Sequence, residues 1–420
     1  MRAATKRHFR YFSAFFVLSF IISLIWTAGF PIERSLQLPP LYEDIPCEWS
    51  GVERIVAVGD LHGAYVYFVQ ILQGTGLIDE NLHWIGGAAH LVQIGDVLDR
   101  GDGPKEIFDL AMRLEKEAEE AGGRVHMLIG NHEEMNLANT AFDREGYVTP
   151  KQFAAFLPEK YRLNQEKKFS RKAGSSSRGD NSAEPDYSEY WQEMIDKGLR
   201  NEAYVPRKTY FRFFNEQYGQ WILSHNVVVR INDIIFVHGG ISETFSLRGL
   251  KEINDQFRLE MEDLRLALLR GLQPQIPEYD REIYNNINGP LWYRGLSRQV
   301  SPEIENDLDR ILANLGAKQI IIAHTPQTAV GEEQMKRYGG KVWIIDTGIA
   351  DYYRPLGGHV SALVYENGKW TVWYPGMETA ASARENPAAP ASLHFFFFSL
   401  HPVFPSQKIL TYQPEKRGGL

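Results

Sequence analysis

Short apolar runs alternate with helical patterns through the middle of this chain. Arg54–Val58, Leu91–Ile94 and Val125–Ile129 are short, mainly apolar and followed directly by glycine, as is typical of buried strands. Between the second and third runs, apolar residues recur at helical spacing until a glycine pair ends the pattern: Ile107, Leu110, Ala111, Leu114 and Ala118, then Gly122-Gly123. This alternation of strand, helix and strand predicts a layered α/β fold.

The second half of the chain continues this rhythm. We expect regular structure at Val227–Val237, a helix over Pro302–Leu315, and buried strands at Gln319–Ala323 and Val342–Ile345. The dipeptide Asn367-Gly368 indicates a tight hairpin turn, because both residue types tolerate the left-handed backbone that such a turn needs. A final hairpin is therefore predicted between Ala362–Tyr365 and Trp370–Trp373.

Residues 141–210 interrupt the alternation and are expected to form an inserted, cap-like and partly flexible region. Its middle, Lys167–Ser188, is rich in serine, glycine and charge, which predicts a solvated loop. Aromatic residues crowd Tyr204–Trp221. They are expected to pack a core, with the lining of a substrate cleft as the alternative.

The N-terminus carries a membrane-targeting pattern. Arg2, Lys6, Arg7 and Arg10 precede an uncharged stretch over residues 11–32, which is long enough to span a bilayer. We expect a membrane anchor, with a cleaved signal peptide as the alternative. Either way the basic end stays inside and the rest is exported, so the main domain would lie in a periplasm or an organelle lumen. The predicted divisions are a basic flank at 1–10, the anchor at 11–32, a linker at 33–50, the main domain at 51–378 and a loose tail at 379–420.

Composition narrows the class of protein. The chain has 420 residues, of which 44% are hydrophobic and 23% charged, as in a globular protein with a core. A net charge of −8 argues against nucleic acid as a partner, although a bound metal would still attract an anionic substrate. Cys47 is the single cysteine, which excludes an intrachain disulfide and a cysteine zinc cluster.

Residues able to bind metals follow five of the apolar runs: Asp60 and His62, Asp96, Asn131 and His132, His238, and His324. Loops at strand ends of an α/β sheet meet at one edge, so these side chains are expected to converge. Aspartate, asparagine and histidine without cysteine suit manganese, iron or zinc. Asp60 and His62 could chelate one ion, and Asp96 could bridge two. Two such ions can hold a hydroxide nucleophile and clamp the oxygens of a phosphoryl group.

The order of the motifs GDLHG, GDVLDRG, GNHE and HGG resembles the signature of the phosphoprotein phosphatase superfamily, within the calcineurin-like metallophosphoesterases. The resemblance spans Arg54 to about Tyr374. GPLWYRG at residues 289–295 and IAHTPQ at residues 322–327 are similar to the Shewanella-like phosphatase branch, and a SAPNYC-type loop is absent from the sequence. The resemblance implies an αββα fold, a layered β-sandwich flanked by helices.

The resemblance also implies a role for each motif residue. Asp60, His62 and Asp96 would bind the first metal ion, and Asp96, Asn131, His238 and His324 the second. His132 would be the general acid, oriented by Asp99. Arg100 and Arg294, together with Asn131, would bind the phosphate. His359 is expected to support the ligands from behind or to have a purely structural role.

Three functions remain open at this point. The first is a phosphatase acting on phosphotyrosine, phosphoserine or phosphothreonine in proteins. The second keeps the chemistry but takes a small phosphoester such as a diadenosine polyphosphate or a nucleotide, because enzymes of that kind share the same four motifs. The third is a non-catalytic, membrane-tethered adaptor, which the loss of a ligand would favour; none of the expected ligands is missing from the sequence.

Overall fold

The computed structural model describes residues 42, 44–174, 186–272, 283–298 and 300–377. The predicted membrane anchor and the C-terminal tail lie outside these residues. Within the described part of the chain, no helix combines the length and the apolar character that a membrane crossing requires.

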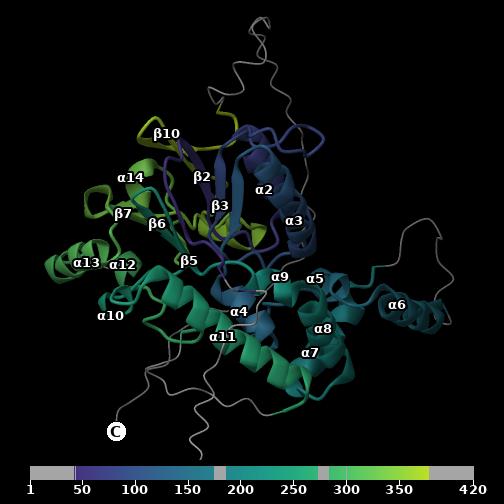
Figure 1. The fold of residues 1–420 in the computed structure, drawn as a ribbon. Helices are drawn as coiled ribbons and strands as arrows, with labels where there is room; N and C mark the ends of the chain where they lie inside the picture. The colour runs from purple at the N-terminus through teal and green to yellow at the C-terminus, as the bar shows by residue number, and fades with distance from the viewer. Residues whose placement is uncertain (1–41, 43, 175–185, 273–282, 299, 378–420) are drawn as a thin grey trace, which may run out of the picture.

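Two mixed β-sheets form the centre of the molecule (Figure 1). The five-stranded sheet has the order β11-β10-β2-β3-β4, and the six-stranded sheet has the order β1-β5-β6-β7-β9-β8. The strands are β1 (Glu48–Trp49), β2 (Arg54–Val58), β3 (His90–Gln93), β4 (Arg124–Met127), β5 (Val228–Ile231), β6 (Ile234–Val237), β7 (Gln319–Ile322), β8 (Lys336–Arg337), β9 (Val342–Ile344), β10 (Ala362–Glu366) and β11 (Lys369–Trp373).

Side chains alternate between the two faces of each sheet, as a pleated strand requires. In β2, Ile55 and Ala57 belong to the apolar cluster between the sheets, together with residues such as Phe236 and Ile321 of the other sheet. Val56 and Val58 of the same strand instead join the cluster beneath the helices. Both faces of the strand are therefore buried, which explains why its sequence is a nearly continuous apolar run.

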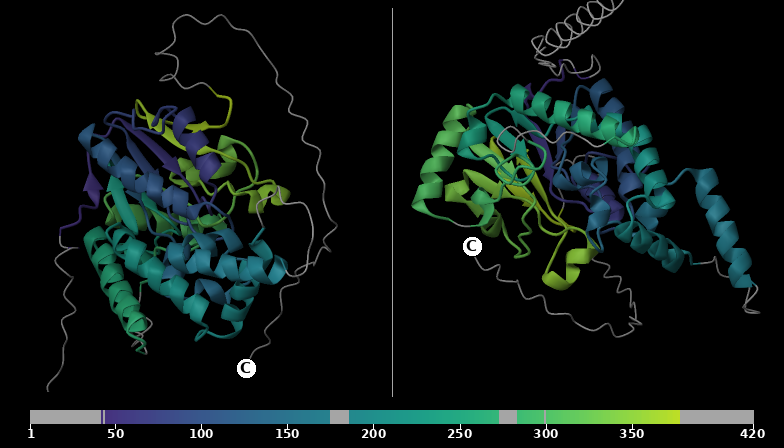
Figure 2. Two further views of the ribbon diagram at one scale, coloured as in Figure 1. Left: turned by 90° about the vertical axis from the view of Figure 1, so that its right-hand side faces the viewer. Right: turned by 90° about the horizontal axis from the view of Figure 1, so that it is seen from below.

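Helices cover the outer faces of both sheets and one end of the molecule (Figures 1 and 2). The α-helices are α2 (Tyr65–Gly74), α3 (Pro104–Glu120), α4 (Asn131–Leu137), α5 (Pro150–Ala155), α6 (Glu159–Gly174), α7 (Ser188–Arg200), α8 (Val205–Phe214), α9 (Gln220–Leu223), α10 (Glu243–Ser246), α11 (Leu250–Leu269), α12 (Gly295–Arg298), α13 (Pro302–Asn314) and α14 (Glu332–Met335). Short turns of 3₁₀ or π-helix complete the list: η2 (Ala141–Asp143), η3 (Asn215–Gly219), η4 (Tyr338–Gly340) and η5 (Asp351–Leu356). The predicted arrangement of a sandwich between helices is confirmed.

The inserted region is mostly helical. Helix α6 continues to Gly174, so the loop prediction is wrong for residues 167–174; residues 175–185 lie outside the described part. Phe169 of α6 packs against Tyr187 and Tyr190, and this apolar contact stabilises the helix although the sequence there is mainly polar. The aromatic residues after Tyr204 pack a core as expected, since Tyr210, Phe211, Phe214 and Tyr218 are buried.

The predicted linker ends earlier than expected. Strand β1 lies within it and pairs in parallel with β5, Glu48 opposite Arg230. The carbonyl oxygens of Cys47 and Trp49 accept hydrogen bonds from the main-chain N–H groups of Arg230 and Asn232. The thiol of Cys47 is buried in the core.

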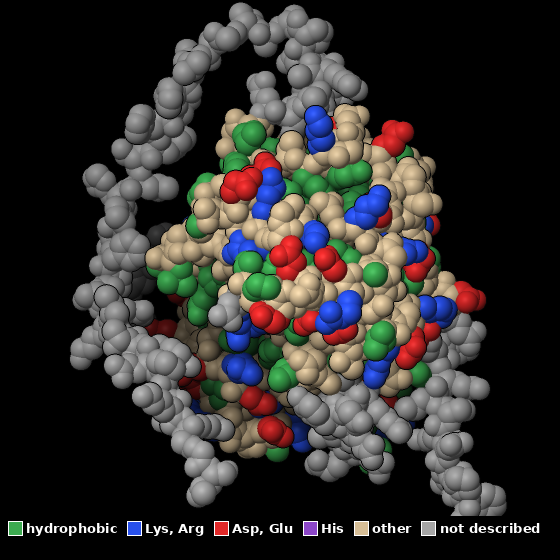
Figure 3. Space-filling view, turned by 90° about the vertical axis from the view of Figure 1, so that its left-hand side faces the viewer, with side chains coloured by type: hydrophobic (Ala, Val, Ile, Leu, Met, Phe, Trp, Pro, Cys, Tyr) green, Lys and Arg blue, Asp and Glu red, His purple; other side chains and the backbone are tan. Residues whose placement is uncertain are grey.

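On the face drawn in Figure 3, positive and negative side chains are interspersed, and neither sign dominates. Ion pairs such as Arg310 with Glu243 and Lys341 with Asp309 link neighbouring elements at the surface. Pairs as exposed as these contribute little to stability.

Candidate active site

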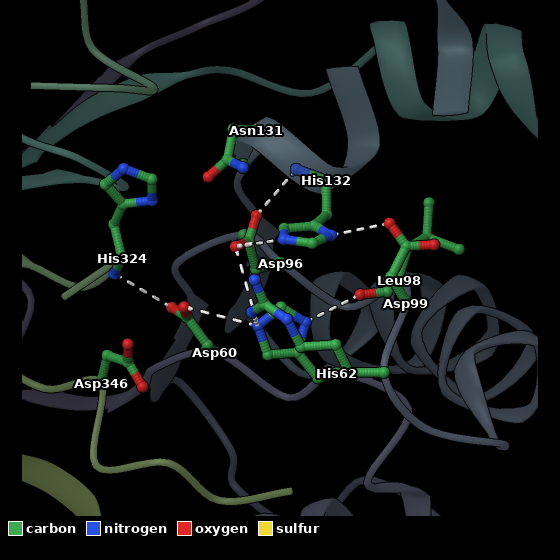
Figure 4. A network of polar contacts seen from close by, with 12 residues as sticks. Asp60, His62, Asp96, Leu98, Asp99, Asn131, His132, His324 and Asp346 are labelled. Carbon is green, nitrogen blue, oxygen red and sulfur yellow. Dashed lines mark hydrogen bonds and ion pairs between the residues drawn. The ribbon is translucent and has the colours of Figure 1, made fainter. Parts of the chain in front are cut away.

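The predicted metal ligands meet at one edge of the sandwich, where parallel strands from both sheets end (Figure 4). Strands β2, β3 and β4 run parallel to each other, as do β6, β7 and β9. The loops at their carboxyl ends therefore face the same space. Five loops bring the ligands there, and all six are buried: Asp60, His62, Asp96, Asn131, His238 and His324.

Two of the histidines are held in the tautomer that metal binding requires. Nδ1 of His62 lies 2.8 Å from the carbonyl oxygen of Leu98, and Nδ1 of His238 lies 2.8 Å from that of Ile94. A carbonyl oxygen can only accept, so each Nδ1 carries a proton, which leaves Nε2 as the nitrogen that can bind a metal. Anchoring the far ring nitrogen in this way is how metal-binding histidines are usually oriented.

The ligand atoms form two groups that share Asp96. Those of Asp96, His238 and His324 all lie within 4.8 Å of one another, as do those of His62, Asp96 and His132. Asp60 Oδ2 lies 3.8 Å from Nε2 of His62. Nε2 of His238 lies 2.9 Å from Oδ1 of Asn131 and 3.1 Å from Nδ1 of His324. Nitrogen and oxygen donors converging in this way suit one divalent ion in each group.

The charges of the buried groups match this arrangement. Burial alone would raise the pKa of Asp96, but His238, His132 and His62 lower it well below its usual range. Burial lowers the pKa of His62, and Arg100 and His132 lower it further. Burial and the neighbouring His238 and Arg294 likewise lower the pKa of His324. The shared carboxylate of Asp96 is thus ionised and these two imidazoles are neutral, as metal binding requires.

The loops reach the site through uncommon backbone conformations. His62, Asp96, Asp99, Arg100 and His324 all have positive φ values, between 43° and 67°. Each such residue costs about 1–3 kcal/mol unless its surroundings compensate, and residues of this kind concentrate at functional sites. A Cβ at Gly130 would lie 2.3 Å from Oδ1 of Asp96, so only glycine allows the two loops to approach this closely.

His132 is held by a chain of buried hydrogen bonds that sequence reasoning found only in part. Its Nδ1 lies 2.6 Å from Oδ2 of Asp99, as predicted. Asn136 and Gln152 also donate to Asp99, at 3.1 Å and 2.8 Å, and Tyr210 donates to Asn136 at 2.9 Å. Gln152 and Tyr210 belong to the inserted region, which therefore supports the site directly. No local motif marks them; only their burial as polar residues in α5 and α8 does.

The two predicted phosphate-binding arginines flank the ligands. The Arg100 guanidinium contacts Nε2 of His62, donates a hydrogen bond to the hydroxyl oxygen of Tyr353 at 2.7 Å, and lies over the ring of Tyr147. Arg294 donates to the carbonyl oxygen of His324 at 2.7 Å and to Oγ1 of Thr325 at 2.8 Å. Both are only partly buried, so their remaining N–H groups can serve an oxyanion.

A cleft of about 590 Å³ opens beside His62 and Arg100. Its lining includes Tyr65, Val66, Tyr67 and Tyr352, and the side chains of Val66 and Tyr352 are well exposed. An aromatic and apolar wall next to an arginine predicted to bind phosphate can hold the organic part of a phosphoester.

Two further buried carboxyl groups belong to the site and were missed. Glu133 accepts hydrogen bonds from the main-chain N–H groups of Asp96, Val97, Leu98 and Gly130, which joins the loop after β3 to the start of α4. Asp346 follows β9 and lies next to Asp60 (Figure 4). Burial raises the pKa of Asp346 to about 6. The place of Glu133 in the motif GNHE could have indicated its role from the sequence, whereas Asp346 lies in none of the recognised motifs.

The main-chain N–H of His359 donates to the carbonyl oxygen of Thr347 at 3.0 Å, and its ring packs against Tyr374. Neither contact is with a predicted metal ligand, so the supporting or structural role of His359 stays a prediction.

Comparison with known proteins agrees with this geometry. Residues 53–328 match the family described as calcineurin-like phosphoesterase. Shewanella-like protein phosphatase 1 of Plasmodium berghei is 29% identical over 74% of this chain and 69% of its own length. Shewanella-like protein phosphatase 2 of Arabidopsis thaliana is 29% identical over 66% of this chain and 67% of its own. The crystal structure of a cold-active protein-tyrosine phosphatase from a psychrophilic Shewanella species is 25% identical, with a TM-score of 0.54 over 80% of this chain and 82% of that one.

The family match covers more than half of the chain and includes all five ligand loops. It confirms the resemblance carried by the motifs. The chain belongs to the calcineurin-like phosphoesterase family and is a hydrolase whose relatives include Shewanella-like protein phosphatases.

Proposed function

We propose that this protein is a dinuclear-metal phosphatase that hydrolyses phosphate monoesters on proteins. The observation that carries the proposal is the pair of ligand groups sharing Asp96, with His132 and Arg100 beside them. Manganese, iron or zinc suits these donors. When bound, two ions would activate the attacking water and neutralise charge on the phosphoryl oxygens.

The residues around the ligands would divide the remaining work. Arg100 and Arg294, with the amide of Asn131, would orient the phosphate. His132 would donate its proton from Nε2 to the leaving oxygen, while Asp99 keeps Nδ1 protonated and the ring in place. The distances also allow His132 to act as a metal ligand. We favour the acid role, because Asp60 already faces His62 and can complete the first group.

Phosphotyrosine is the substrate residue we propose first. The tyrosine-lined cleft beside Arg100 supports it, because an aromatic wall can pack against the phenyl ring of the substrate. The matched structure is that of a protein-tyrosine phosphatase, which points the same way. Phosphoserine and phosphothreonine remain candidates because the cleft is open, and a small phosphoester is the alternative class of substrate.

The test is hydrolysis of matched peptides that carry phosphotyrosine, phosphoserine or phosphothreonine, and of diadenosine tetraphosphate, by the full-length protein with Mn²⁺, Zn²⁺ or a chelator. We expect turnover of phosphotyrosine that the chelator removes and that Asp96→Asn abolishes. Turnover of the nucleotide alone would move the function to small phosphoesters. Metal binding without turnover of any substrate would favour the adaptor function.

A substitution in the cleft tests the preference among residues. Tyr352→Ala should lower kcat/KM about tenfold for the phosphotyrosine peptide, equivalent to one lost aromatic contact, and leave the phosphoserine peptide nearly unchanged. Equal losses on both peptides would contradict a role for this wall in recognising the ring.

We further propose that the N-terminal segment tethers the protein to a membrane, with the catalytic domain on the far side. The uncharged stretch at residues 11–32 after four basic residues supports this. Carbonate extraction and protease protection of membrane fractions would test it. Release by carbonate, or digestion of the domain from the cytoplasmic side, would overturn it.

A further inference from the structure

Asp346 lies at the metal edge of the sandwich, but one of its oxygens has no hydrogen-bond donor. The side chain is completely buried. Oδ1 accepts the main-chain N–H of Gly348 at 3.1 Å, whereas Oδ2 has no donor among the described residues. Within that part of the chain, Oδ2 is the single carboxylate oxygen among the buried side-chain atoms that lack a partner.

The neighbour of the Asp346 carboxyl is another carboxyl group, that of Asp60 (Figure 4). Asp96 adds a third acidic group to the same buried space, where it interacts electrostatically with both. Burying carboxyl groups together without a counter-charge is costly, and a cation held between them removes that cost. The position of Asp346 therefore favours the binding of a cation on the Asp60 side of the site.

The backbone, rather than the side chain, fixes Asp346 at this place. A Cβ at Gly59 would lie 2.2 Å from the carbonyl oxygen of Ile345, so the loops after β2 and β9 are in direct contact. The carbonyl oxygen of Asp346 accepts the N–H of Gln327 at 2.7 Å. An aspartate that only capped a turn would need one oxygen for the cap, and its second oxygen could lie beside any hydrogen-bond donor. Here the carboxyl group lies beside that of a predicted metal ligand, Asp60 (Figure 4).

We propose that Asp346 is a further acidic residue of the metal centre, which adds negative charge beside Asp60 and thereby strengthens the binding of the ion at the first metal site. This inference rests on the proposed two-metal function. Asp346 acts on the same ion as Asp60, so it is a supporting residue and not a catalytic one.

The experiment measures Mn²⁺ binding to the full-length protein by equilibrium dialysis with elemental analysis. We expect two ions in the natural protein. In Asp346→Asn, which keeps the shape but removes the charge, one ion should bind 10–100-fold more weakly while the other is retained, as is usual when a partner of a metal ligand is lost. Asp309→Asn, an exposed aspartate of α13, is the matched control and should bind both ions normally.

A double-mutant cycle shows whether Asp346 and Asp60 act on the same ion. Asp60→Asn should weaken the same ion, and the double variant should lose little more, because both substitutions affect one site. Additive losses, or normal binding of both ions by Asp346→Asn, would overturn the inference. Failure of the natural protein to bind two ions would instead overturn the proposed function.

Thermal unfolding separates metal binding from a merely structural role. Without metal, Asp346→Asn should be as stable as the natural protein or more so, because it relieves repulsion among buried carboxyl groups. With Mn²⁺ it should gain less stability than the natural protein gains. An equal loss of Tm with and without Mn²⁺ would show a structural role and overturn the inference.

Discussion

His132 is restrained on both its ring and its backbone. Nδ1 faces Asp99 at 2.6 Å, and the main-chain N–H donates to Oδ1 of Asp96 at 2.9 Å. Because the network behind Asp99 contains Asn136 and Gln152, the ring cannot turn without breaking buried hydrogen bonds. Nε2 is thereby left facing the ligands, 3.8 Å from Oδ2 of Asp96.

Loss of this ring should depend on the leaving group. His132→Ala should reduce kcat about 10²–10⁴-fold on an alkyl phosphate, whose leaving oxygen needs a proton. On p-nitrophenyl phosphate the reduction should be much smaller, because that phenolate departs without one. Steady-state kinetics on both substrates would check this, with the exposed His83→Ala as the control. Similar losses on both substrates would count against an acid role and favour a ligand role.

Single polar side chains join the elements that carry the site. The Glu133 carboxylate, at the start of α4, accepts N–H groups of the loop after β3 at 2.8–3.2 Å. Hydrogen bonds to a buried charged group are among the strongest in proteins. The N-terminus of α4 also favours negative charge.

Glu133→Gln should therefore destabilise the protein by about 2–3 kcal/mol, because one amide group cannot accept every N–H and its own NH₂ would face donors. Urea unfolding would measure the change. Glu189→Gln, on the exposed side of α7, should stay within about 0.5 kcal/mol of the natural protein. A loss in Glu133→Gln no larger than in that control would contradict the joining role.

Strands β3 and β4 share a buried histidine pair away from the metal site. Nε2 of His126 lies 3.0 Å from Nδ1 of His90, and Trp49 of β1 packs edge-on against His126. Burial and the nearby Arg124 lower the pKa of His90 to about 4. In the unfolded chain the same group titrates near 6.5, so the folded state binds fewer protons between these values.

Stability should accordingly fall as the pH drops from about 6.5 to about 4, with His90 contributing about 1–3 kcal/mol of the loss. His90→Gln cannot be protonated, so its unfolding free energy should decrease less over this range. Urea unfolding at several pH values would check the difference, and His83→Gln at the surface should follow the natural protein. Identical pH dependence in His90→Gln and the natural protein would contradict the assignment.

At the scale of the whole molecule, the ligands come from both sheets. Asp60, His62, Asp96 and Asn131 follow strands of the five-stranded sheet, whereas His238 and His324 follow strands of the six-stranded one. Bound ions would therefore brace the two sheets against each other at their common edge.

Metal should consequently stabilise the entire fold. Mn²⁺ at 100 times its Kd should add about 2.7 kcal/mol per site to the unfolding free energy, and a chelator should remove this gain together with activity. The gain should shrink as the pH falls, because burial and Asp346 raise the pKa of Asp60, and a proton held there competes with the ion. Calorimetry with and without chelator at two pH values would test both effects. A Tm that is insensitive to chelator at pH 7.5 would contradict the bracing role.

The sequence by itself determined strands β2, β3, β4, β7 and β9, the final hairpin with its turn at Asn367-Gly368, and the loops that carry the ligands. These features depend on local chemistry: apolar runs form buried strands, and asparagine and glycine accept positive φ, here 54° and 76°. The motif order was enough to identify the family and the side chains that meet at the site. Aromatic residues after Tyr204 were also correctly expected in a core.

Only the tertiary structure decided which other residues complete the site. Gln152 and Tyr210 reach Asp99 and Asn136 from an insertion that the sequence indicated only as a cap-like region. Asp346 lies beside Asp60, although the two residues are far apart in the sequence. Strand β1 likewise pairs with β5, far along the chain. Helix α6 extends into residues that were predicted as a loop, where Phe169 packs against Tyr190. Such contacts arise from the packing of distant segments, so no local period or motif records them, and burial in the folded chain is what gives these polar groups their role.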